Sequence, residues 1–158
     1  MAAFFKINEL YKIAVEMERN GLAFYSEVAS QSADEQTRAV YHYLASAEKR
    51  HLRTFKKLMG NKTFSAPQSY RGEYRKYLGA LLKDRVFPSS HLARSRAARS
   101  GPSTSLKAGI AAEKESILFY MELRDLVSAA DRVAIDRILG EEKRHLRRLS
   151  EYKEKGCL

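Results

Sequence analysis

The sequence Glu-Lys-Arg-His occurs at residues 48–51 and again at residues 142–145. Residues three apart on a helix lie on the same face, so each copy places one carboxylate beside one imidazole. In both copies this face is otherwise apolar, with Tyr41, Leu44, Phe55 and Leu58 around the first and Ile135, Ile138, Leu149 and Tyr152 around the second. Burying a charged side chain is unfavourable unless it is paired or binds a metal. The pattern therefore predicts a polar site inside a helical core.

The two copies belong to a longer internal repeat. Glu48 and His51 recur as Glu142 and His145 at an offset of 94 residues. The preceding helical segments each contain a Glu followed seven residues later by a Tyr, which are Glu18 and Tyr25 in the first half and Glu113 and Tyr120 in the second. The repeat predicts two similar helical hairpins.

The helix signals place four long helices at about 9–30, 33–59, 104–127 and 129–155. We expect one domain over residues 1–158, with hairpins at 8–59 and 108–155. Residues 60–107 are predicted to form a long crossover with a short helix at about 70–85, and residues 94–105 to form an exposed basic loop. The expected fold is an all-α four-helix bundle with one long crossover.

The net charge of +10 is concentrated in the crossover, where residues 60–107 contain 10 basic and 2 acidic side chains. A solvated linker is the simpler interpretation, and a surface for nucleic acid or for an acidic redox partner is the alternative. The single cysteine, Cys157, excludes a disulfide framework and a Cys-x-x-Cys metal site. No run of eighteen apolar residues indicates a membrane span, and we expect a cytoplasmic location without membrane or nucleic-acid partners.

Packing the two hairpins together would bring four Glu and two His to the centre of the core. Four buried carboxylates repel one another, whereas two divalent cations would nearly neutralise them. We therefore predict a dinuclear metal site with the ligands Glu18, Glu48, His51, Glu113, Glu142 and His145. Mixed carboxylate and imidazole ligands suit iron or manganese, and zinc is a further substitute.

A single Glu-x-x-His on a helix is usually a solvated pair. The metal prediction therefore depends on finding the pair twice, each time on an otherwise apolar helical face, which we call the apolar seam. Small residues near the helical glutamates would leave room for metals and a small oxidant, and these are Ala14, Gly21, Gly109 and Ser116. Tyr25 and Tyr120 lie two turns from Glu18 and Glu113 on the same faces. We interpret them as hydrogen-bond partners of the ligands with a role in catalysis, the alternative being core aromatics with satisfied hydroxyl groups.

With these motifs the chain resembles the rubrerythrin branch of the ferritin-like di-iron carboxylate superfamily, in its single-domain form without a rubredoxin module. The resemblance covers both hairpins and implies a ferritin-like fold with an oxo-bridged pair of iron ions that reacts with hydrogen peroxide or dioxygen. It also implies bridging roles for Glu48 and Glu142 and more terminal roles for the other four ligands. Typical rubrerythrins have an extra Glu one turn after the third-helix ligand, where this chain has Ser116.

We therefore expect a non-haem di-iron oxidoreductase that reduces a small oxidant. Because two Cys-x-x-Cys pairs of a rubredoxin module are absent, its electrons would come from a separate donor protein. The alternative function is iron binding or storage with ferroxidase activity and no peroxidase turnover. Bundles of this kind often dimerise, and we expect a homodimer.

Overall fold

The computed structural model of the protein describes residues 7–60, 73–83 and 91–156. Within these ranges the chain forms helices and no strands. The helices are α1 (Ile7–Gln31), α2 (Glu35–Met59), α3 (Glu73–Leu82), α4 (His91–Ala98), α5 (Pro102–Leu126) and α6 (Ala129–Glu154). The prediction of an all-α fold is confirmed.

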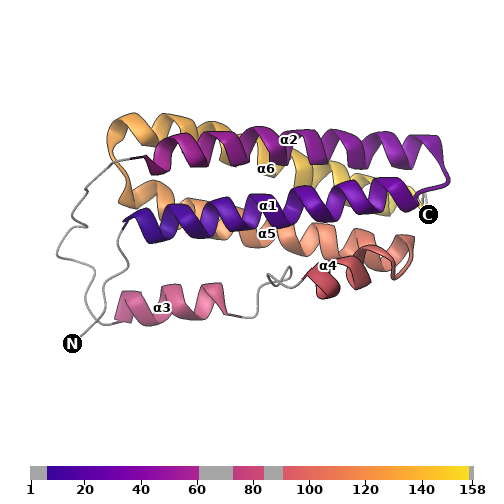
Figure 1. The fold of residues 1–158 in the computed structure, drawn as a ribbon, viewed down its shortest axis with the longest axis horizontal. Helices are drawn as coiled ribbons and strands as arrows, with labels where there is room; N and C mark the ends of the chain where they lie inside the picture. Colours follow the sequence, from indigo (N-terminus) through magenta and orange to yellow (C-terminus); the bar gives the residue numbers. More distant parts are fainter. Residues whose placement is uncertain (1–6, 61–72, 84–90, 157–158) are drawn as a thin grey trace.

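The four long helices form the bundle (Figure 1). Helix α1 packs along α2 and α5 packs along α6, which gives the two expected hairpins, and the hairpins meet through contacts of α1 with α5 and of α2 with α6. Short turns make the two helices of each hairpin run in opposite directions. Helix α3 lies at the end of the bundle where α2 finishes, and α4 lies at the end where α5 begins (Figure 1).

Side-chain caps define where two of these helices begin. The Asp34 carboxylate accepts a hydrogen bond of 2.7 Å from the Thr37 backbone N–H at the start of α2. The Ser128 hydroxyl accepts from the Asp131 backbone N–H at the start of α6. Such caps satisfy backbone donors that have no partner within the helix. The cap of α2 is therefore Asp34, and the helix begins at Glu35, two residues later than the predicted start at about 33.

The prediction of an exposed loop at 94–105 is wrong. Residues 91–98 form α4, and α5 begins at Pro102, with Gly101 before it at a φ of 105°. Arg94 donates a hydrogen bond of 2.6 Å to the Asn20 side chain, and Ser95 and Arg99 each donate one of 2.8 Å to Glu27. These contacts with α1 hold α4 in place, and nothing in the local sequence reveals them.

The predicted short helix at 70–85 is seen as α3 in its described part. Leu78 is buried, and the Tyr77 hydroxyl donates a hydrogen bond of 3.0 Å to Glu122 on α5. The crossover therefore contains two short helices where one was expected. Residues 61–72 and 84–90 of the predicted crossover, and Cys157, lie outside the described residues.

Two apolar clusters fill the core of the bundle. One includes Leu10, Tyr11, Phe55, Phe119 and Ile135, and the other includes Phe24, Tyr41, Leu44, Leu106 and Leu149. Between them along α1 lies Glu18, with Ala14 of the first cluster on one side and Tyr25 of the second on the other. The core therefore has a polar layer enclosed by apolar side chains.

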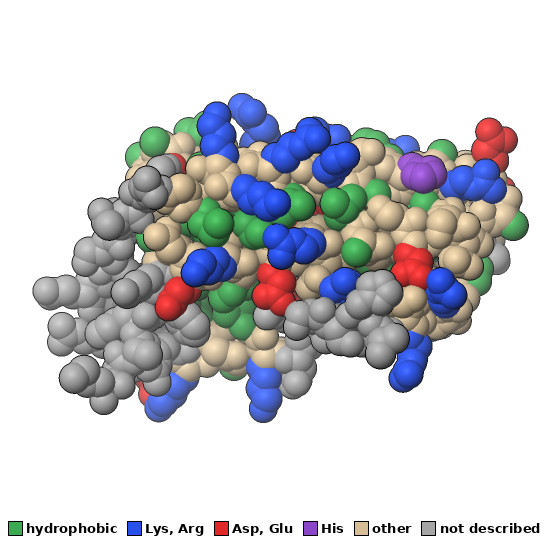
Figure 2. All heavy atoms as spheres, viewed as in Figure 1, with side chains coloured by type: hydrophobic (Ala, Val, Ile, Leu, Met, Phe, Trp, Pro, Cys, Tyr) green, Lys and Arg blue, Asp and Glu red, His purple; other side chains and the backbone are tan. Residues whose placement is uncertain are grey.

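The basic surface extends beyond the crossover onto α2. This helix exposes Arg38, Lys49, Arg50, Arg53, Lys56 and Lys57, whereas of its two acidic residues Glu35 is exposed and Glu48 is buried. Lys and Arg side chains accordingly outnumber Asp and Glu on the face that Figure 2 shows. Within the described ranges, no helix combines the length and apolar character needed to cross a bilayer.

Candidate metal centre

The polar layer contains all six residues that we predict as metal ligands. Each of the four long helices contributes to it, and every one of the six residues is at most 5% exposed. The residues are Glu18 on α1, Glu48 and His51 on α2, Glu113 on α5, and Glu142 and His145 on α6. The duplicated seam thus converges on one buried point.

The six residues form two overlapping groups, each able to surround one metal ion. The first group is Glu18, Glu48, His51 and Glu142, and the second is Glu48, Glu113, Glu142 and His145. Within each group the candidate ligand atoms lie within 4.8 Å of one another. Only Glu48 and Glu142 belong to both groups, which is the arrangement that two bridging carboxylates require.

Both imidazoles present the same nitrogen to the carboxylates. His51 Nδ1 lies 3.3 Å from Glu142 Oε1 and 3.4 Å from Glu18 Oε2. His145 Nδ1 lies 3.0 Å from Glu142 Oε2 and 3.7 Å from Glu113 Oε2. The two Nδ1 atoms therefore face the interior of the site, and the two Nε2 atoms face away from it.

Several polar atoms of the centre have no hydrogen-bond partner within the part of the chain that the structure describes. They are Glu18 Oε2, Glu48 Oε1, His51 Nδ1 and Glu142 Oε1, all buried. Buried polar atoms in folded proteins are nearly always satisfied, so a group of orphans in one place calls for a bound partner. Carboxylate oxygens and imidazole nitrogens are ligands for iron and manganese. The residues present therefore fit a pair of divalent cations.

Without metal, the charges of the centre are balanced by protons. Burial, with the neighbouring carboxylates, raises the pKa of Glu18 and of Glu48 well above the usual range and that of Glu113 to about 8. Burial lowers the pKa of His51 and His145, but the surrounding glutamates outweigh it and raise these values to about 9 and about 10. Metal ions must displace these protons in order to bind.

This proton balance predicts that the stability of the metal-free protein and its affinity for metal change in opposite directions with pH. Between pH 5 and pH 9 the folded metal-free centre holds carboxyl and imidazolium protons that the unfolded chain releases at about 4.3 and 6.5. The free energy of unfolding of the metal-free protein should therefore fall as pH rises through this window. Metal affinity should rise over the same window, because protons compete with metal for the ligands. Thermal unfolding with and without a chelator at several pH values tests both trends, and a metal-free protein whose stability rises with pH would contradict them.

Tyr25 and Tyr120 connect the two hairpins. The Tyr25 hydroxyl donates a hydrogen bond of 2.5 Å to Glu113 Oε1, and the Tyr120 hydroxyl donates one to Glu18 Oε1. Each tyrosine thus serves the glutamate of the other hairpin rather than the one on its own helix. Seven residues span about 10.5 Å along a helix, which is too far for a phenol to reach back. The hydroxyl groups are satisfied, and they hold the carboxylates in orientation.

Sequence reasoning missed Glu141. Its side chain is 20% exposed, and its Oε2 lies 3.1 Å from His51 Nε2 and 3.3 Å from Arg50 Nη2. These cationic neighbours lower its pKa, although partial burial opposes them. Glu141 lies outside the apolar seam of α6, so periodicity gives no signal for it, and its contact depends on how α6 packs on α2.

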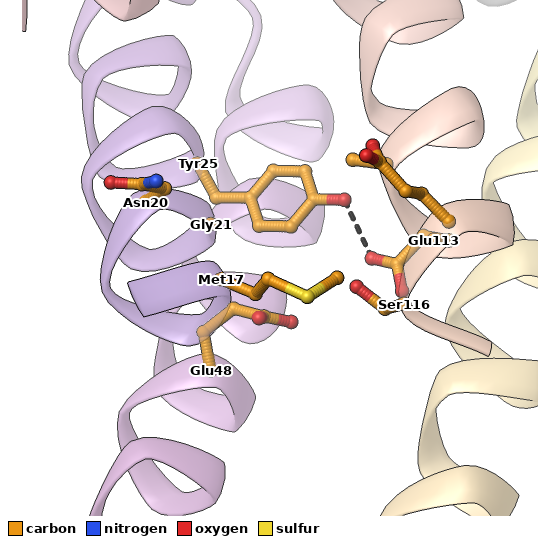
Figure 3. Close-up of a pocket in the computed structure, with 9 residues that line it drawn as sticks. Met17, Asn20, Gly21, Tyr25, Glu48, Glu113 and Ser116 are labelled. Atoms are coloured by element: carbon orange, nitrogen blue, oxygen red, sulfur yellow. Dashed lines mark hydrogen bonds between the residues drawn. The ribbon is translucent and has the colours of Figure 1, made fainter. Parts of the chain in front are cut away.

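A small cavity lies beside the centre between α1 and α5 (Figure 3). Its volume is about 20 Å³, and it is lined by Met17, Asn20, Gly21, Tyr25, Glu48, Ala112, Glu113, Glu115 and Ser116. About 10–15 Å³ of such volume suffices for one water molecule. The cavity therefore has room for a molecule close to water in size.

The absence of a side chain at Gly21 leaves the space that the Glu48 carboxylate occupies. A Cβ atom at this position would lie 2.8 Å from Glu48 Oε2 and 3.2 Å from its Cδ. Helix propensity alone would favour Ala over Gly by about 1 kcal/mol. We expect Gly21→Ala to displace the carboxylate and to lower metal affinity by about tenfold or more, equivalent to about 1.4 kcal/mol.

Gly140 on α6 provides the matched control for this substitution. A Cβ atom there would meet only Arg144 Nη1, at 3.7 Å. Gly140→Ala should stabilise the fold by up to about 1 kcal/mol and leave metal affinity unchanged. Equal metal affinity in the two variants, measured by calorimetric titration, would show that Gly21 has no special role.

Comparisons with known proteins agree with this geometry. The family model described as Rubrerythrin matches residues 5–59, which cover α1 and α2. The whole chain is similar to a crystal structure from Thermotoga maritima described as a ferritin-like diiron-carboxylate protein, with a TM-score of 0.75 and 23% sequence identity over 99% of both chains. No curated protein matches the chain at the level of significance applied. The chain therefore resembles the Rubrerythrin family over its first hairpin and shares a ferritin-like fold over both hairpins.

Proposed function

We propose that the protein binds a pair of iron ions and uses them to reduce hydrogen peroxide or dioxygen. The observation that carries this proposal is the buried set of four carboxylates and two imidazoles, with unpartnered ligand atoms, beside a cavity of about 20 Å³. The Rubrerythrin match, and the similarity to a structure described as a diiron-carboxylate protein, favour iron over manganese and zinc.

In this proposal the two groups of ligands each hold one ion. Glu18 and His51 would serve one ion and Glu113 and His145 the other, with Glu48 and Glu142 between them. Two ferrous ions, when bound, supply the two electrons that convert one hydrogen peroxide and two protons into two water molecules. The protein supplies the ligand geometry, the access and the protons.

The cavity determines which oxidants can reach the centre. Glu48 and Glu113 line it together with Gly21 and Ser116, so a small molecule that enters lies next to ligand residues from α2 and α5 (Figure 3). A volume of about 20 Å³ admits peroxide or dioxygen more readily than any organic peroxide. The burial of the six ligand residues keeps bulk water out.

Tyr25 is a proton donor at this cavity. It lines the cavity, and its hydroxyl donates to Glu113. Burial and the nearby carboxylates raise the pKa of Tyr25, so the hydroxyl stays protonated, and the pKa of Glu113 is raised to about 8. The pair can therefore retain a proton beside the oxidant and pass it on.

The two tyrosines give a matched test of this role. Both donate to a ligand glutamate, but Tyr120 is absent from the cavity lining. Tyr25→Phe should slow peroxide reduction by about 100-fold or more, the contribution of a positioned general acid, and Tyr120→Phe should slow it much less. Stopped-flow absorption after mixing the ferrous protein with peroxide measures both rates, and equal rates would remove the special role of Tyr25.

Electrons for repeated turnover would come from a separate protein. The sequence contains one cysteine, too few for an iron–sulfur or rubredoxin-type centre of its own. An acidic donor would be attracted to the exposed Lys and Arg side chains of α2, close to the ligand-bearing turn of that helix.

Anaerobic loading with ferrous iron followed by hydrogen peroxide tests the proposed function. We expect ferric absorption to develop, and a chemical reductant should restore the ferrous protein for many further cycles. A single stoichiometric oxidation that cannot be repeated would instead favour the ferroxidase or storage alternative. Mass measurement adds to this, since a dimer is consistent with an enzyme and a large shell of subunits with storage.

A further inference from the structure

The two imidazoles of the centre differ on the side that faces away from the carboxylates. His51 Nε2 lies 3.1 Å from Glu141 Oε2, and Arg50 binds the same oxygen at 3.3 Å. His145 Nε2 is buried and has no hydrogen-bond partner within the described residues. One imidazole is therefore held by a carboxylate on its outer side, and the other is not.

The difference originates in the repeat itself. At the offset of 94 that relates Glu142 to Glu48, the position equivalent to Glu141 is Ala47, which is buried and has no hydrogen-bonding side chain. His145 instead meets the ring of Tyr43 edge-on, with ring centroids 5.8 Å apart. The guanidinium of Arg148 lies 4.6 Å from the Tyr43 centroid. Among the described residues, an aromatic ring that carries a guanidinium on its face thus contacts His145, and an alanine stands at the position equivalent to Glu141.

An outer carboxylate changes what an imidazole can do for a metal. Donation of the outer N–H to a carboxylate fixes the ring orientation and leaves the inner nitrogen with its lone pair, and it also makes that nitrogen a stronger ligand. Glu141 can do this for His51, whose Nδ1 faces the site. His145 must bind with an outer nitrogen that has no acceptor, so its orientation depends on packing alone.

We propose that the two metal positions differ in their affinity for metal, and that Glu141 is the positioning residue that causes this difference. The position served by Glu18 and His51 binds the first metal ion tightly. The position served by Glu113 and His145 binds the second ion more weakly and releases it first. This inference rests on the proposed function only in requiring that the centre holds two metal ions.

Stepwise loading of the metal-free protein with Co²⁺ under anaerobic conditions tests the proposal. Calorimetry and visible absorption should resolve a tight and a weak step in the wild-type protein. His51→Ala should remove the tight step, and His145→Ala the weak one. Glu141→Ala should weaken the tight step by about 10- to 100-fold and leave the weak step nearly unchanged.

Two further variants separate this role from general effects of charge. Glu141→Gln keeps an oxygen that can accept from His51 Nε2, so it should recover part of the affinity that Glu141→Ala loses. Glu151→Ala removes a carboxylate on the same helix whose side chain is 53% exposed, and it should change neither step.

A nuclear magnetic resonance measurement reads the contact directly. In the metal-free wild-type protein the His51 Nε2 proton should be shifted downfield and slow to exchange, because it is hydrogen-bonded to a carboxylate. Glu141→Ala should remove this signal without moving the signals of His145.

The outcomes separate this inference from the proposed function. A wild-type protein that binds no pair of metal ions would overturn both. A wild-type protein that binds two ions, with both steps unaffected or equally weakened in Glu141→Ala, would overturn the inference and leave the function standing.

Discussion

Glu48→Ala should abolish binding of both metal ions, whereas Glu18→Ala should remove only one. Glu48 belongs to both groups of ligand atoms and Glu18 to one. Losing a shared carboxylate takes a ligand from each ion and removes a negative charge between two cations, which then repel each other. Metal analysis of protein purified without oxygen should give two ions per chain for the wild type, about one for Glu18→Ala and close to none for Glu48→Ala.

The comparison of the two variants is informative because both residues are buried carboxylates. Each replacement removes the same chemical group from the same polar layer, so a general effect of mutating the core would lower both metal contents alike. Glu48→Gln and Glu18→Gln repeat the test with side-chain volume preserved. If Glu18→Ala lost both ions as completely as Glu48→Ala, the assignment of shared and unshared ligands would be wrong.

Removing the metal ions should lower the thermal stability of the protein substantially. A ligand at 100 times its dissociation constant stabilises the folded state by about 2.7 kcal/mol per site. For a chain of this size, each kcal/mol shifts Tm by about 2–4 °C, so each site should contribute roughly 5–10 °C. Thermal unfolding followed by circular dichroism, with added ferrous iron or with a chelator under anaerobic conditions, measures this shift.

The physical reason is that, within the described residues, the metal-free core contains several polar atoms without hydrogen-bond partners. Glu18 Oε2, Glu48 Oε1 and Glu142 Oε1 are among them, and leaving such groups buried costs about 1–3 kcal/mol each. The Glu48→Ala variant should show little response to added metal and so serves as the control. An unchanged Tm in the wild-type protein on chelation would mean that the folded state does not bind metal at this centre.

Local pattern in the sequence was sufficient to predict the four long helices and the convergence of the six ligand residues. The seam of α2 contains Tyr41, Leu44 and Phe55 around Glu48 and His51, and all of these are buried in the structure. The apolar face of a helix packs into the core, so a charged pair on that face is buried with it. The duplication of that face then indicated which second helix would meet the first.

Features that depend on packing between distant segments could not be predicted in this way. Helix α4 was expected to be a loop because its own sequence is basic and short, and its position depends on contacts with Asn20 and Glu27 on α1. The hydrogen-bond partner of Tyr25 could not be predicted from the local sequence either, because its hydroxyl donates to Glu113 on the other hairpin.

Glu141 shows the same limit at the site itself. Periodicity identifies residues that point into a core, but Glu141 approaches His51 from the edge of the α2–α6 interface, where its side chain is partly exposed. Its neighbour Glu142 is a predicted ligand, and the offset of a single residue decides between the two roles. Such residues become visible only when two helices have been placed against each other.

Anomalous diffraction from a crystal grown anaerobically with a ferrous salt is the most direct test of the metal centre. The account predicts two iron peaks per chain, one among Glu18, Glu48, His51 and Glu142 and the other among Glu48, Glu113, Glu142 and His145. Iron found only at the protein surface, or a polar layer whose side chains remain bonded to one another with no peak between them, would contradict it.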